Sequence, residues 1–75
     1  MPDIESLTAD LKKAEAHVRQ GEEHIRRQKR IIAVLERDGH NSGMARDVLS
    51  TFERIQEGHI AHRDRLAVAL GEAAD

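Results

Sequence analysis

Apolar and small residues recur along the first half of the chain at alternating steps of three and four residues. Gly21 and Gln28 are the two positions that interrupt the apolar character of this stripe. Its members are Ile4, Leu7, Leu11, Ala14, Val18, Gly21, Ile25, Gln28, Ile32 and Leu35. This spacing is the a/d pattern of a heptad repeat, which gives a helix one seam for packing against other helices. It predicts a helix over residues 4–37, with Asp3 capping the first turn.

A polar turn follows this stripe at residues 38–43. Gly39 suits the left-handed conformation that ends many helices, and Asn41 or Ser42 can cap a helix that follows. A linker this short makes two neighbouring helices antiparallel. The second helix is predicted over about residues 43–70. Its seam again alternates steps of three and four, through Ala45, Val48, Phe52, Ile55, His59, His62, Leu66 and Ala69.

The expected fold class is all-α: one antiparallel two-helix hairpin over residues 1–75 that dimerises into a four-helix bundle or antiparallel coiled coil. Placing Leu35 opposite Val48 leaves the first turns of the first helix without an intrachain partner, because the second helix ends too early to cover them. A lone hairpin also exposes one side of each seam, so both arguments predict a homodimer. The side chains expected to carry the interface are Ile4, Leu7, Leu11, Val18, Ile25, Ile32, Leu35, Val48, Phe52, Ile55 and Leu66.

Composition narrows the classes of function. A chain of 75 residues has little stability margin unless a disulfide, a metal or oligomerisation supports it, and it has no Cys. The net charge of −2 and the single aromatic residue, Phe52, argue against a nucleic-acid-binding protein. No apolar run approaches the ~20 residues of a membrane span. The segment Met1–Glu5 has no secretory signal pattern, so we expect a cytoplasmic protein that does not associate with membranes.

A polar layer is predicted in the middle of the hairpin. The expected register places Gly21 level with His62 and His24 level with His59. His24, His59 and His62 are therefore candidate metal ligands, because imidazoles at such spacing can coordinate a transition metal. The alternative is a hydrogen-bonded layer that fixes register at some cost in stability. The absence of Cys and of a His-Glu-x-x-His motif favours the structural layer, so we expect no bound cofactor.

Two other polar segments offer little chemistry. The basic run Arg26–Arg30 could contact phosphate, but Glu22 and Glu23 lie at ion-pair spacing from it and explain it as a solvated face. The loop around Ser42 has turn and cap chemistry and lacks an acid, a base and a nucleophile in a catalytic arrangement. The sequence therefore predicts that the protein is not an enzyme.

Three segments carry a resemblance to known sequences: RQKRIIAVLERDGH at residues 27–40, ARDVLSTFE at 45–53 and HRDRL at 62–66. Together they resemble a group of short uncharacterised helical proteins of alphaproteobacteria, especially rhizobia and their relatives. This chain departs from that pattern at Gly43 and at the Asp47–Leu49 run. The resemblance implies a small bacterial cytoplasmic protein, and it brings no function and no site residues.

These patterns favour a structural or interaction protein that associates with itself. One alternative is an adaptor module that presents the start of the first helix, or the basic face, to another helical protein. A second alternative is a metal-binding bundle that uses His24, His59 and His62.

Overall fold

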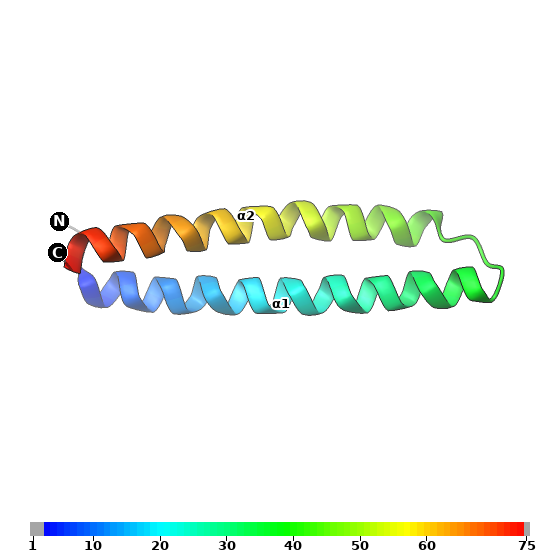
Figure 1. Cartoon of the computed structure of the whole chain (residues 1–75), viewed down its shortest axis with the longest axis horizontal. Helices are drawn as coiled ribbons and strands as arrows, with labels where there is room; N and C mark the ends of the chain where they lie inside the picture. Colours follow the sequence, from blue (N-terminus) through cyan, green and yellow to red (C-terminus); the bar gives the residue numbers. More distant parts are fainter. Residues whose placement is uncertain (1–2, 75) are drawn as a thin grey trace.

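The computed structural model describes residues 3–74, which form two antiparallel helices joined by one turn (Figure 1). Helix α1 spans Ile4–Arg37 and helix α2 spans Gly43–Ala74. They pack side by side along their whole length into a rod of 56 × 14 × 14 Å. The predicted all-α helical hairpin is confirmed. Helix α2 continues past Leu70, where the sequence predicted its end.

Helix α1 has a capped start and a capped end. The Asp3 carboxylate accepts a hydrogen bond from the backbone N–H of Glu5 at 3.2 Å, which satisfies one of the free donors of the first turn. At the other end, Gly39 adopts a φ of 74°. The backbone N–H of His40 then donates to the Leu35 carbonyl at 2.8 Å, and the N–H of Gly39 donates to the Glu36 carbonyl at 3.2 Å. This pair of bonds is a Schellman motif, which requires a residue that tolerates positive φ at Gly39.

The linker sets the register of the hairpin. After Gly39 the chain turns back beside the last turn of α1, and α2 begins only after that return (Figure 1). The Asn41 side-chain carbonyl accepts a hydrogen bond from the Gly43 N–H at 2.8 Å, and the Ser42 carbonyl accepts one from the Arg46 N–H at 2.9 Å. Because part of the linker lies alongside α1, residues of α2 lie farther from the turn than the sequence-based alignment assumed, and Ala45 meets Gln28.

The predicted seam of α1 is confirmed. All five of its buried residues belong to the three-four stripe: Leu7, Ala14, Val18, Gln28 and Ile32. The expected overhang of α1 is wrong, because α2 reaches Ala74 and lies beside the start of α1 (Figure 1). Leu7 is therefore covered within the chain, while Ile4 remains exposed.

The predicted seam of α2 is wrong by one residue at three of its positions. Val48 and Ile55, which are 42% and 51% exposed, and the exposed His62 lie beside the seam. The positions that are buried or half-buried are Ala45, Leu49, Phe52, Gln56, His59, Arg63, Leu66, Ala69, Leu70 and Ala73. This rotation covers Leu49 in place of Val48 and adds Leu70 to the half-buried Ala69, so a larger apolar side chain faces α1 at both places.

Candidate functional site

Two glutamines join the helices by reciprocal hydrogen bonds. The Gln28 amide on α1 donates to the backbone carbonyl of Ala45 on α2 at 2.8 Å. The Gln56 amide on α2 donates to the backbone carbonyl of Val18 on α1, also at 2.8 Å. Both side chains are buried. Because a misaligned hairpin would leave these buried amides without partners, the two bonds penalise any other register.

Gly21 provides the space in which the Gln56 amide lies. A Cβ atom added at Gly21 would lie 1.7 Å from Gln56 Oε1 and 2.6 Å from its Cδ. The stripe is therefore interrupted at Gly21 because a long polar side chain from α2 crosses there. The sequence indicated that something large lies opposite Gly21, but the expected neighbour, His62, is wrong.

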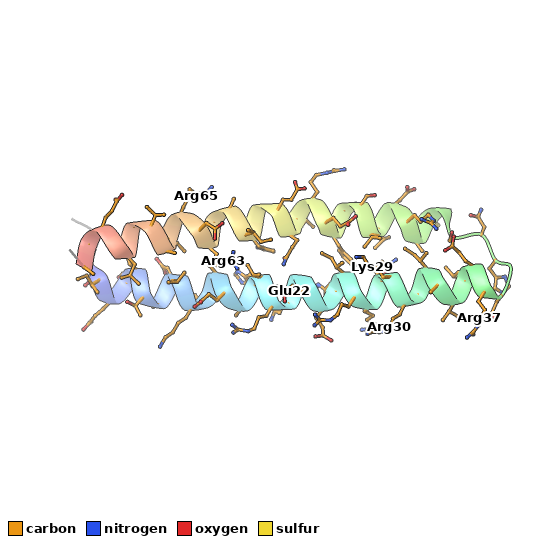
Figure 2. The ribbon with its side chains drawn as sticks, in the orientation of Figure 1. Glu22, Lys29, Arg30, Arg37, Arg63 and Arg65 are labelled. Atoms are coloured by element: carbon orange, nitrogen blue, oxygen red, sulfur yellow. The ribbon has the colours of Figure 1, made fainter. Side chains whose placement is uncertain are left out.

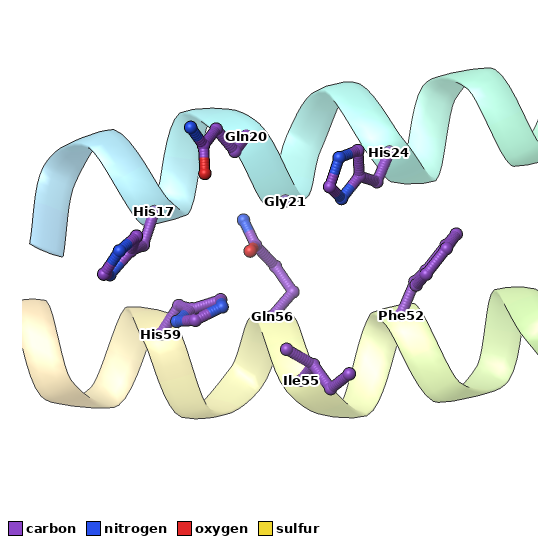
Figure 3. Close-up of a pocket in the computed structure, with 8 residues that line it drawn as sticks. All are labelled: His17, Gln20, Gly21, His24, Phe52, Ile55, Gln56 and His59. Carbon is purple, nitrogen blue, oxygen red and sulfur yellow. The ribbon is translucent and has the colours of Figure 1, made fainter.

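Two ring pairs flank this crossing point (Figure 3). The imidazoles of His17 on α1 and His59 on α2 have ring centroids 5.3 Å apart with an interplanar angle of 37°. On the other side of Gln56, the His24 ring lies 5.6 Å from the Phe52 ring, tilted by 36°. Both pairs join the two helices, and tilted pairs of this kind add to the packing between them.

An open cavity of about 200 Å³ lies between the two ring pairs (Figure 3). Its lining is His17, Gln20, Gly21, His24, Phe52, Ile55, Gln56 and His59. Gln56 Oε1 is buried and has no hydrogen-bond partner among the described residues. A buried carbonyl oxygen without a donor is costly, so this atom is the most polar unsatisfied point of the cavity wall.

The three predicted metal ligands are not brought together. His59 lies beside His17, His24 lies beside Phe52, and His62 is exposed beside the seam. Within residues 3–74, no group of three or more His, Asp or Glu side chains is placed to hold a metal ion. His17 was missed because it lies one position before the a/d stripe. The signal that points to it is its spacing of seven residues from His24 on the same flank of α1.

Hollows continue from this cavity along one side of the hairpin. A second hollow shares His24 and Phe52 with the first, and a third, lined by Arg27, Arg30, Ile31, Val34 and Leu35, shares Arg27 and Ile31 with the second. In the heptad geometry, Val48 and His62 flank the α2 seam on the same side as Ile55. We call this surface the histidine side; it comprises His17, His24, Ile31, Val34, Val48, Phe52, Ile55, His59 and His62.

The opposite side of the hairpin has a different character. Its flanking positions include Glu15, Glu22, Lys29 and Glu36 on α1 and Arg46 and Glu53 on α2, and we call it the charged side. The Arg46 guanidinium bridges to the Glu36 carboxylate from one helix to the other. This surface has the composition of a face that water covers.

The basic run does not form one patch. Arg26 pairs with Glu23 at 2.9 Å, and Arg27 lines two hollows of the histidine side. Arg30 lines one of these hollows beside Arg27, whereas Lys29 flanks the α1 seam on the opposite side of the hairpin (both residues are labelled in Figure 2). These charges are therefore spread around α1, which weakens the case for a single phosphate-binding surface.

Comparisons with family models, with curated proteins and with solved structures found no match to this chain. Neither helix, over the residues that the structure describes, contains a stretch long and apolar enough to cross a membrane.

Proposed function

We propose that this protein is a self-associating helical hairpin, and that its histidine side packs against the same side of a second copy to form a four-helix bundle. The continuous row of hollows along the histidine side carries this proposal. Exposed aliphatic side chains accompany the row: Ile31, Val34, Val48 and Ile55. An apolar surface that runs along neighbouring helices is typical of an interface.

The sparse core of the single chain supports the same proposal. The buried apolar residues of the described chain are Leu7, Ala14, Val18 and Ile32, all on α1. Small domains with so little buried apolar area usually require additional support to be stable. With no cysteine, oligomerisation is the support that the chain's own residues can supply.

A second copy fits the surface better than a strongly charged partner does. The chain's net charge of −2 creates little repulsion between two copies. The cavity at the centre of the histidine side is lined by imidazoles, amides and apolar groups and by no Lys, Arg, Asp or Glu, so two copies can meet there about a twofold axis without charge repulsion, while Arg27 and Arg30 line the hollows nearer the turn. A cytoplasmic location and the absence of enzymatic activity remain parts of this proposal.

Sedimentation or light-scattering mass over about 1–200 µM protein tests the proposal, because weak and moderate dimers dissociate in that range. The parent mass should rise toward that of a dimer. The double variant Ile31→Glu, Ile55→Glu should weaken association by at least about 30-fold, since a buried unpaired carboxylate costs about 2–5 kcal/mol. A matched control is the double variant Ile60→Glu, Val68→Glu, which adds two charges at exposed positions outside the histidine side.

The outcome separates this function from the alternatives. A parent that stays monomeric at the highest concentration, or a control that weakens association as much as the test variant does, overturns the proposal. The adaptor hypothesis no longer has an overhanging helix to present, because α2 covers the start of α1. The adaptor hypothesis is still supported by the hollow along Ile31 and Val34, which has room for one helix of another protein.

A further inference from the structure

His17 and His59 place two imidazoles side by side at the cavity. One imidazole comes from each helix, and their ring centroids lie 5.3 Å apart. His17 is exposed and His59 is half-buried, so the pair is reached from solvent through the open cavity. Figure 3 shows both rings at the same end of that cavity.

The spacing of this pair matches that of two ligands of one metal ion. With metal–nitrogen bonds of about 2.0–2.1 Å and tetrahedral angles, two imidazoles on one zinc ion have ring centroids about 5 Å apart. The observed separation of 5.3 Å is close to that value. Imidazole is also a preferred ligand for zinc, nickel and copper.

Gln56 supplies a second observation at the same place. The side chain is 6% exposed, lines the same cavity, and its Oε1 has no donor within the described chain. Water bound to a metal ion is a strong hydrogen-bond donor, and such outer-shell acceptors commonly orient metal sites. Because Oε1 itself is closed to solvent, its bond to a water on a cation held by the histidines requires the Gln56 amide to tilt toward the cavity.

We propose that His17 and His59 form a two-imidazole site for a divalent transition metal, zinc or its neighbours nickel and copper. Gln56 Oε1 accepts a hydrogen bond from water on the metal. The remaining coordination positions are open to solvent, because the described residues place no third ligand there. Such a site joins α1 to α2 and stabilises the folded hairpin by mass action. The pair lies within one chain, so this proposal does not rest on self-association.

Thermal unfolding of the untagged full chain with zinc chloride or nickel chloride tests the site. With metal at about ten times its dissociation constant, the melting temperature should rise by about 5–10 °C. EDTA should reverse the shift. His17→Ala and His59→Ala should each abolish the metal-dependent shift. The matched controls His24→Ala and His62→Ala remove a histidine from the same side and should retain it.

A second measurement, NMR of the parent chain with nickel, identifies the ligands directly and does not depend on variants that fold poorly. Substoichiometric nickel, which is paramagnetic, should broaden the ring proton signals of His17 and His59 before those of the other histidines. Both measurements are repeated on the single variant Ile31→Glu, which should weaken association and leaves the lining of the cavity around the histidine pair unchanged. The proposal is overturned by a parent that shows no metal-dependent shift, by a shift that survives in His17→Ala or His59→Ala, or by uniform broadening of all five histidines.

Discussion

The histidine side and the charged side occupy equivalent flanks of the same two helices, yet their side chains differ in kind. Next to the seam, the histidine side presents His17, His24 and Ile31 from α1, whereas the charged side presents acids and bases that include the Glu36–Arg46 pair. If water covered both flanks of the hairpin, similar charged positions would be expected on each. This difference is why we propose that the histidine side, and not the charged side, meets a second copy.

The two sides also differ in how much their contacts contribute to the free energy of unfolding. On the charged side, ion pairs between half-exposed groups contribute little free energy. On the other side, aromatic and aliphatic groups close over the crossing of Gln56 and Gly21. We therefore expect the largest effects from variants in the seam and at the cavity, and the smallest from variants on the charged side.

The largest effect is expected at Phe52, which packs between the seam and the histidine side against His24. Phe52→Ala should lower the free energy of unfolding by about 3 kcal/mol, because it removes the largest apolar side chain near the cavity. Urea denaturation followed by helical circular dichroism measures the change. Phe52→Leu, which keeps most of the apolar volume, should cost less than half as much. An alanine variant that unfolds at the parent's urea concentration would contradict this role.

Neighbouring residues on α2 separate the seam from the flank. Leu49→Ala should cost about 2 kcal/mol at concentrations where the chain is monomeric, because Leu49 packs in the seam. Val48→Ala should cost under about 0.5 kcal/mol there, because Val48 is exposed. Denaturation at low and high protein concentration provides the measurement. Equal costs for the two variants in the monomer would show that the seam lies elsewhere.

Two glycines provide a smaller and more specific contrast. Alanine is favoured over glycine inside a helix by about 1 kcal/mol. Gly58→Ala should realise most of that gain, since nothing lies within 4 Å of the added Cβ atom. Gly21→Ala should instead destabilise by about 1 kcal/mol, because displacing the Gln56 amide from Val18 costs more than the helix gains. Melting temperatures that move in the same direction for both variants would contradict the placement of the Gln56 amide against Gly21.

The smallest effect belongs to the charged side. Glu36→Gln should change the free energy of unfolding by less than about 0.5 kcal/mol, because both partners of the Glu36–Arg46 pair are about half exposed. The difference from the parent should shrink further between about 0.05 and 0.5 M salt, as screening increases. Denaturation at the two salt concentrations checks this. A loss as large as that of Leu49→Ala would mean that the two sides are not energetically distinct.

The sequence predicted the parts of the fold that depend on local chemistry and an unambiguous pattern. On α1 the apolar stripe has one phase, and the structure buries residues from that phase alone. The Asp3 cap and the Gly39 turn were also predictable, because each depends on the backbone preference of one residue type.

The α2 seam could not be read in the same way, since two stripes one residue apart overlap on that helix. Ile55 favours one phase by hydrophobicity, whereas Gln56 favours the other through a hydrogen bond to Val18 across the hairpin. A hydrophobic pattern does not contain that long-range bond. The path of the linker beside α1 was equally hidden, and it changed which histidine meets His59.

The two glutamine bonds have a consequence for how this chain tolerates change. Their acceptors at Val18 and Ala45 are backbone carbonyls, which every amino acid supplies. Alignment of the helices therefore depends on the identity of Gln28, Gln56 and the glycine beside Gln56, and not on the side chains at the acceptor positions. An evolving lineage or a protein engineer could replace the outer faces of both helices and still recover the same alignment.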